Sequence, residues 1–216
     1  KEKNLRQPGV ERHSAKTTQP IFGYDNECVP EIEVEWAVLE TFAEVGVIPP
    51  EHARLLTPFL KMYLLEKITT SEIQKLEDES TEHYIGALTQ LIVKYLPPEL
   101  KPYVHLTLTS EDTLCTAIAM RFQRAQKALK PLIRQVVKQL GEKIHAHRAD
   151  VKMDRTHGQH AVPTTFGAEF ASILERMMDC AEQMEKLVQR IPGKISGPIG
   201  TYGAQIAIEL PQACGN

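Results

Sequence analysis

The chain of 216 residues is long enough for one large domain or two small ones. It carries 25 basic and 28 acidic residues, a formal net charge of −3, and 42% of its residues are hydrophobic. This balance is typical of soluble globular proteins, and it excludes a disordered chain, a collagen-like repeat and a protein that coats nucleic acid.

Apolar runs, the chain start and the cysteines all indicate a cytoplasmic protein. No run approaches the roughly 18 apolar residues of a membrane span, and the polar residues 1–10 do not resemble a signal peptide. The cysteines form no C-x-x-C pair and do not cluster with histidines at ligand spacing; they are Cys28, Cys115, Cys180 and Cys214. We therefore expect reduced thiols, no structural zinc and no membrane partner.

Helical periodicity begins after residues 1–29, which are polar and aperiodic and which we interpret as an irregular arm. The first apolar residues at helical spacing are Ile32, Trp36, Leu39 and Ala43. Gly46 and the following Pro49-Pro50 predict the end of this helix. A second helical stretch over residues 55–63 is interrupted near Pro58.

Two capping patterns predict the next helix starts. Ser71 and Gln74 fit an S-x-x-Q capping box. Ser80 or Thr81 then caps a helix that runs to Leu96, where two prolines end it.

Two much longer helices follow. Residues 112–148 carry an apolar stripe, and Pro131 is expected to kink that helix. Pro163 fits the first position of the second helix, whose apolar residues repeat at alternating spacings of four and three. These residues are Phe166, Phe170, Ile173, Met177, Cys180, Met184, Leu187 and Ile191. Strand-like alternation is confined to a weak possibility at residues 103–108, so the predicted class is all-α, with apolar faces that require partner subunits.

Acidic and basic residues are unevenly distributed. Residues 31–85 contain 12 acids and 4 bases, whereas residues 86–150 contain 5 acids and 10 bases. Solvated helix faces explain this pattern, and the bases lack the interleaved aromatic residues on which single-strand binders stack bases. We expect no nucleic-acid partner, and the basic region is equally suited to an anionic small-molecule substrate.

Three polar loops at helix starts are candidate sites. The first places His83 in a first helical turn, where the helix dipole favours a neutral imidazole. The second combines a T-x-x-D capping box at residues 109–112 with two hydroxyls, which suits carboxylate or phosphate binding. The third contains His157 and His160, which suit general acid–base catalysis better than metal binding. A surface histidine, a simple cap and a structural loop are the respective alternatives.

A fourth segment, residues 193–203, contains four of the 12 glycines. It matches neither the dinucleotide-binding spacing nor the P-loop spacing. A close backbone approach to a ligand and a simple turn are both open for it.

Together these segments resemble one family. Residues 155–167 (RTHGQHAVPTTFG) strongly resemble the T-H-G-Q segment of the adenylosuccinate lyase family, in the fumarase/aspartase superfamily. Residues 103–112 (YVHLTLTSED) resemble its V-H-F-G-L-T-S-E-D stretch, and residues 193–202 (GKISGPIGTY) resemble its G-K-I-S-G-A-V-G-T-Y stretch. The matches keep the family's order from residue 21 to residue 205.

The resemblance implies a cofactor-free lyase that forms a homotetramer with active sites built from three subunits. Its β-elimination would release fumarate from adenylosuccinate and from the succinyl-carboxamide intermediate of purine synthesis, so the partner is a succinylated purine nucleotide. The implied domains are an irregular arm (1–29), an N-terminal helical domain (30–111) and the incomplete first part of a central helical bundle (112–216).

The resemblance also implies roles for single residues. His157 matches the histidine assigned as general acid to the leaving nitrogen, and His83 matches one that supports the acid or binds substrate. The implied substrate-binding residues are Thr109, Ser110, Thr156 and, more weakly, Gln159. No metal ligand or cofactor-binding residue is implied.

Two departures from the family stand out. Tyr84 replaces the aspartate that follows the family's histidine, which removes a polar substrate contact. The S-S-x-M-P-x-K-x-N loop with the catalytic serine base is absent from these residues. We therefore interpret the chain as the N-terminal part of a lyase and expect it to be inactive alone. Another succinyl or polycarboxylate substrate, and a truncated non-catalytic helical scaffold, are the alternatives.

Overall fold

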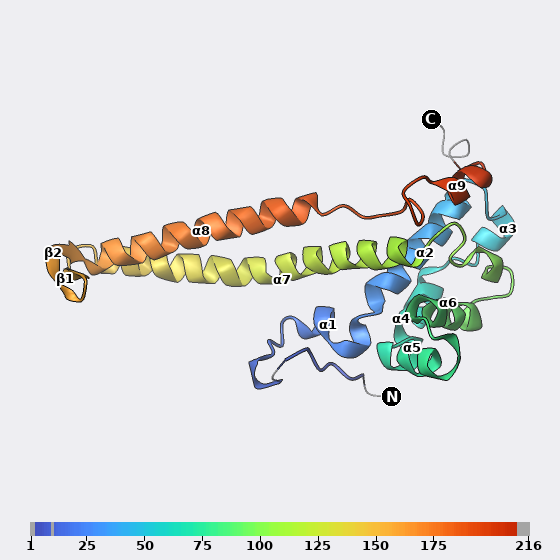
Figure 1. Ribbon diagram of the computed structural model, residues 1–216, viewed down its shortest axis with the longest axis horizontal. Helices are drawn as coiled ribbons and strands as arrows, with labels where there is room; N and C mark the ends of the chain where they lie inside the picture. Colours follow the sequence, from blue (N-terminus) through green and yellow to red (C-terminus); the bar gives the residue numbers. More distant parts are fainter. Residues whose placement is uncertain (1–2, 10, 211–216) are drawn as a thin grey trace. The chain divides into compact units, whose positions relative to one another are not determined.

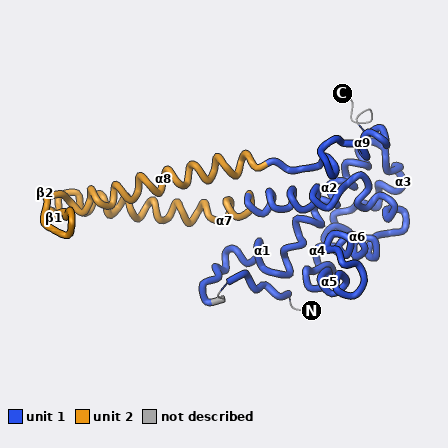
Figure 2. The backbone as a smooth tube through the Cα atoms, in the orientation of Figure 1, with its two compact units in different colours: residues 1–122, 192–216 blue, residues 123–191 orange. Residues whose placement is uncertain are grey.

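A computed structural model of the chain describes residues 3–9 and 11–210. The chain divides into two compact units (Figure 2). Unit 1 comprises residues 1–122 and 192–216, and unit 2 comprises residues 123–191. The predicted all-α class is confirmed, because the described residues contain a single two-stranded sheet and are otherwise helical or irregular (Figure 1).

Unit 1 consists mainly of short helices. Its α-helices are α1 (Gln19–Phe22), α2 (Val29–Glu44), α3 (Pro50–Ala53), α4 (Pro58–Lys67), α5 (Thr70–Leu76), α6 (Tyr84–Tyr95), the first part of α7 (Ser110–Ala146) and α9 (Gly203–Ala207). Shorter helical pieces are η1 (Glu11–His13), η2 (Tyr24–Asn26), η3 (Glu77–Thr81) and η4 (Lys101–Tyr103). The segment that the sequence predicts to be an irregular arm therefore contains η1, α1 and η2.

The core of unit 1 surrounds α2. Ile32, Trp36 and Leu39, which the spacing predicts on one helical face, are each 1% exposed. Buried residues that join them from other segments include Ile48, Leu64, Ile73, Leu88 and Ile92. The helix ends at Glu44, and Gly46 follows in the left-handed conformation with φ +79°, which favours glycine. The predicted face and end of this helix are confirmed.

The starts of α4 and α5 correct two predictions. Pro58 is the first residue of α4 and not an interruption, and the Thr57 hydroxyl caps that helix. Helix α5 is capped by Thr69, whose Oγ1 accepts the N–H of Glu72 at 3.3 Å. The predicted capping box at residues 71–74 is therefore wrong by two positions, because residues 69–71 are three consecutive hydroxyl residues and each is a possible cap.

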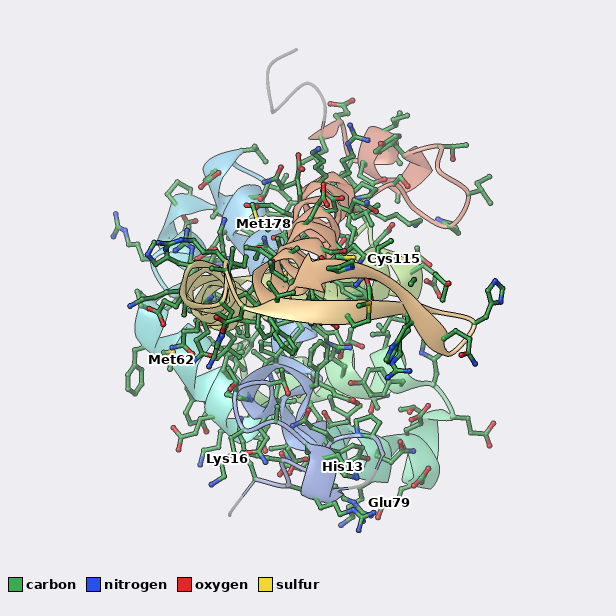
Figure 3. The ribbon with its side chains drawn as sticks, turned by 90° about the vertical axis from the view of Figure 1, so that its left-hand side faces the viewer. His13, Lys16, Met62, Glu79, Cys115 and Met178 are labelled. Atoms are coloured by element: carbon green, nitrogen blue, oxygen red, sulfur yellow. The ribbon has the colours of Figure 1, made fainter. Side chains whose placement is uncertain are left out.

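Unit 2 is a helical pair joined by a hairpin. Its elements are the rest of α7, strands β1 (Val151–Thr156) and β2 (Gln159–Thr165), and helix α8 (Phe166–Arg190). The strands pair antiparallel, and Figure 3 shows them side by side. Lys130 in α7 donates to Glu185 in α8 at 2.6 Å. The expected loop is therefore a hairpin, and Pro163 lies in β2 rather than at the start of α8, which Thr165 caps.

The predicted apolar seam of α8 is partly open to solvent. Phe166 is 44%, Ile173 40% and Leu187 66% exposed. Such a row of exposed apolar side chains on a long helix is typical of an interface. No helix in the described part of the chain is long and apolar enough to cross a membrane.

Cys28 is fully buried at the start of α2. Its thiol lies 3.7 Å from the carbonyl of Asp25 and 3.6 Å from that of Ile68. Burial raises the pKa of this thiol from 9.0 to about 12. Cys115 and Cys180 are free thiols as well, and Cys214 lies outside the described residues.

The buried Cys28 thiol should make stability fall with rising pH in alkali. The unfolded chain releases this proton above pH 9.0, whereas the folded chain keeps it up to about 12, so the stabilisation is complete below 9.0 and lost across that window. In this window, the free energy of unfolding of the Cys28→Ala variant should fall less steeply than that of the wild type, by up to about 1.4 kcal/mol per pH unit. Urea unfolding, followed by the fluorescence of Trp36, measures both slopes, and parallel slopes would contradict the prediction.

Candidate functional site

The candidate residues fall into two groups, one in each unit. The group in unit 1 consists of His83, Thr109 and Ser110. The group in unit 2 consists of Thr156, His157 and Gln159. Each group has its own geometry within its unit.

His83 is the N-cap of α6 and not a residue of its first turn. The predicted caps, Ser80 and Thr81, belong to η3, and the chain turns at Glu82 with φ +50° before α6 begins. The Nδ1 atom of His83 accepts the N–H of Gly86 at 3.0 Å, so the ring takes the place of a capping hydroxyl. An exposed imidazole is thereby held by its own helix.

The other ring nitrogen of His83 connects two distant segments. Its Nε2 lies 3.3 Å from the Oγ of Ser110, which is the first residue of α7. Thr109 directly precedes Ser110. The structure therefore brings His83 to the helix start that carries both candidate hydroxyls.

Asp112 anchors this helix start from inside. Its fully buried carboxylate accepts the N–H of Thr109 at 2.9 Å, which is half of the predicted capping box. It also accepts the Nζ of Lys194 at 2.5 Å and the N–H groups of Ser196 and Gly197, both at 3.1 Å. Burial raises the pKa of Asp112, but these hydrogen bonds outweigh burial and leave the pKa below its ordinary value. The glycine-rich segment is thus tied to the start of α7.

A second buried carboxylate orients a histidine, His105, that is not among the predicted site residues. Glu35 is 2% exposed, and its Oε1 lies 2.7 Å from the Nδ1 of His105. Its Oε2 accepts the N–H of His105 at 3.1 Å, and Thr113 donates to Oε1 at 2.9 Å. His105 adopts φ +57°, which is uncommon for a residue with a side chain. The signal was present, because Glu35 lies three residues after Ile32 on the apolar face of α2, and a buried charge requires partners.

Tyr84 is bonded to a third buried carboxylate. Its hydroxyl donates to Oε2 of Glu31 at 2.8 Å, and Arg121 donates to Oε1 of Glu31 at 2.7 Å and to the carbonyl of Glu27. Burial raises the pKa of Glu31, and the two donors offset this only in part. Burial also raises the pKa of Tyr84. At the position where the family that this chain resembles has an aspartate, Tyr84 forms an internal hydrogen bond to Glu31.

The Tyr84→Phe variant should show that this hydroxyl has a structural role. It leaves buried Glu31 with one donor fewer, so the free energy of unfolding should fall by about 1–3 kcal/mol. Tyr95→Phe is the control, since the Tyr95 ring packs edge-on against Tyr63. Urea unfolding of both variants measures the difference, and an equal loss in both would contradict the structural role.

The second candidate group occupies the tip of the hairpin in unit 2. Thr156 and Gln159 pair across the strands, and His157 and Gly158 form the two-residue loop with φ +52° and +73°. Positive φ at both positions is typical of a type I′ turn. Arg155 closes the tip by donating to the carbonyl of Gly158 at 3.1 Å. All three candidates are exposed to solvent in this unit.

The two histidines of the hairpin differ in their surroundings. The Nε2 of His160 lies 2.9 Å from Nη2 of Arg155, so a permanent cation engages that ring. Within residues 3–9 and 11–210, no hydrogen bond engages the ring of His157. The same residues contain no group of three or more histidine, cysteine or acidic side chains that could hold a metal ion.

The amino-acid sequence is similar to those of known lyases. A family model described as lyase matches residues 15–211. Adenylosuccinate lyase from Bacillus subtilis is 34% identical over 194 residues, and that from Staphylococcus saprophyticus is 30% identical over 194 residues. Each alignment covers 89% of this chain and 43% of the relative. The chain therefore spans less than half the length of these relatives.

Solved structures show the same fold at lower identity. A fumarate lyase from Mesorhizobium sp. BNC1 matches 93% of this chain and 48% of its own, with a TM-score of 0.76 and 22% identity. For a 3-carboxy-cis,cis-muconate lactonizing enzyme from Pseudomonas putida, the match covers 93% of this chain and 46% of the enzyme's chain, with a TM-score of 0.80 and 20% identity. For a β-carboxy-cis,cis-muconate cycloisomerase from Acinetobacter calcoaceticus, the match covers 91% of this chain and 46% of the enzyme's chain, with a TM-score of 0.75 and 21% identity.

Proposed function

Because the chain belongs to the lyase family, in the fumarase/aspartase superfamily, we propose that it is part of an enzyme that cleaves adenylosuccinate. The reaction is a β-elimination that breaks a carbon–nitrogen bond and releases fumarate, and the succinyl-carboxamide intermediate of purine synthesis is a second substrate. The observation that carries this proposal is the T-H-G-Q segment at residues 155–167, within a chain 34% identical to an adenylosuccinate lyase.

His157 is the proposed general acid. The elimination requires a proton for the departing nitrogen while a base removes a proton beside a carboxylate. The exposed ring of His157 is suited to this task, because the two-residue turn fixes its backbone and no described group occupies its nitrogens. The proposed base is the family's serine, which does not occur in a matching motif among these residues.

The helix start in unit 1 is the proposed anion-binding part. Removal of the proton builds a second negative charge on the substrate carboxylate, and preorganised donors stabilise it. The hydroxyls of Thr109 and Ser110 and the first N–H groups of α7 are such donors. Thr156 is the proposed contact of the fumaryl carboxylate, and Gln159 is a further contact of the substrate.

We propose a homotetramer in which neighbouring chains complete each site. The exposed apolar side chains of both long helices support this, because a shared bundle would bury them. On α7 they are Ile118, Phe122, Leu132 and Val136. Sedimentation of the native protein measures the assembly, and four chains are expected.

Fumarate release by native protein from the gene that encodes this chain tests the proposal. The intact mass is determined first, and adenylosuccinate, argininosuccinate and carboxymuconate are then assayed side by side. We expect conversion of adenylosuccinate and of neither other compound. A preparation whose intact mass is 24.3 kDa, the mass of this chain, should be inactive. Conversion of carboxymuconate alone would replace the proposed substrate by a polycarboxylate. Inactivity towards all three, with a reading frame that stops after residue 216, would favour a helical scaffold.

A further inference from the structure

His83 is hydrogen-bonded at both ring nitrogens, and the two bonds depend on each other. Its Nδ1 faces the N–H of Gly86 at 3.0 Å. A backbone N–H is always a donor, so Nδ1 must be an unprotonated acceptor. A neutral imidazole with an unprotonated Nδ1 carries its proton on Nε2. The contact of 3.3 Å to Ser110 is therefore a donation from Nε2 to Oγ.

The opposite proton placement would set two donors against each other. If Nδ1 carried a proton, as in the imidazolium or the other neutral tautomer, that proton would face the N–H of Gly86 and α6 would lose its cap. The backbone supports the cap, since His83 has the extended conformation of an N-cap with φ −153°. Thr81 donates to the carbonyl of His83 at 3.2 Å and holds this conformation.

We infer that His83 is a neutral positioning residue that acts through Ser110 and does not itself carry the proton of the reaction. Because Oγ of Ser110 accepts from His83, the hydroxyl proton of Ser110 is free to be donated elsewhere. Ser110 then offers this proton to an anionic oxygen of the substrate. The identity of that oxygen rests on the proposed function, whereas the tautomer of His83 does not.

Nuclear magnetic resonance of the ¹⁵N-labelled chain tests this inference without a substrate. At about pH 8, we expect a scalar coupling across the hydrogen bond between the Gly86 amide nitrogen and Nδ1 of His83. We also expect a slowly exchanging proton on Nε2. Ser110→Ala should make that proton exchange at least about tenfold faster while the coupling stays.

Ser80→Ala is the matched control, since Ser80 lies close to His83 in the chain, in η3, but donates to the carbonyl of Leu76. It should change neither signal. A proton on Nδ1, or no coupling to Gly86 while α6 is folded, would overturn the tautomer. A Nε2 proton that stays slow in Ser110→Ala would overturn the link to Ser110.

A fumarate titration of the same sample separates this inference from the proposed function. Wild type should show shifts of the Ser110 amide, with at least about tenfold weaker affinity in Ser110→Ala, roughly the contribution of one hydrogen bond to a charged group. A chain that shows the coupling but does not respond to fumarate would contradict the donor role of Ser110, whereas the proposed function, whose sites require neighbouring chains, is tested by fumarate release from the native protein. The tautomer of His83 would stand in that case.

Discussion

Replacing His157 by Gln should lower kcat for fumarate release by a factor of about 10²–10⁴, the usual contribution of a general acid or base. Glutamine keeps a polar side chain at the hairpin tip but cannot give a proton to the leaving nitrogen. KM should change little, because the proposed substrate contacts Thr109 and Ser110 remain. Steady-state kinetics of the assembled native protein, with adenylosuccinate as the substrate, measure both constants.

His160→Gln is the matched control for this loss. His160 lies in the same hairpin and is also exposed, but its Nε2 contacts Arg155 at 2.9 Å. Its replacement tests whether hairpin geometry alone changes the rate. Much of kcat should survive in His160→Gln, whereas equal losses in both variants would assign the effect to the hairpin and remove His157 as the acid.

The helices could be predicted from the sequence wherever one whole face is apolar. The spacing of Ile32, Trp36 and Leu39 places them on one helical face, and it predicts α2 because burial of this face drives the packing of the helix. The helix ends just before Gly46, whose positive φ favours glycine. The sequence predicts the start of α8 three residues early, because proline at a helix start and proline in an edge strand leave the same local signal.

The hairpin could not be predicted from the same signals. Its strands are mostly exposed, so no core face imposes an alternating pattern on residues 151–165. Its loop is His157-Gly158, and the dipeptides that mark a type I′ turn are Asn-Gly and Asp-Gly. The sequence located the candidate residues in one segment but not the pairing of Thr156 with Gln159.

The unit 1 site depended on contacts between residues far apart in the chain. Serine and threonine are strong N-caps, so local rules favoured Ser80 and Thr81 over His83. One ring nitrogen of His83 caps α6. The other contacts the hydroxyl of Ser110, which lies 27 residues away in the chain. Periodicity carries no information on such pairs.

The buried Asp112 shows what these long-range pairs contribute to stability. It accepts hydrogen bonds from Lys194, from two backbone N–H groups of the glycine-rich segment and from Thr109. Since its pKa is lowered in the folded chain, this stabilisation is present above the ordinary value of 3.8 and is lost as the pH falls through the lower folded-state value. Near neutral pH it is fully present, so a substitution there measures all of it.

Asp112→Asn should lower the free energy of unfolding of unit 1 by about 3–5 kcal/mol, because it leaves the ammonium of Lys194 without its buried partner. The lower end is expected, since the Lys194 side chain is 30% exposed and can reach water. Urea unfolding followed by Trp36 fluorescence measures the loss. The Asp112→Asn/Lys194→Met double variant should recover part of it. Glu79 is labelled in Figure 3 and forms an exposed pair with Lys75. Glu79→Gln, which breaks this pair, should have no measurable effect, and an equal loss there would contradict the role of Asp112.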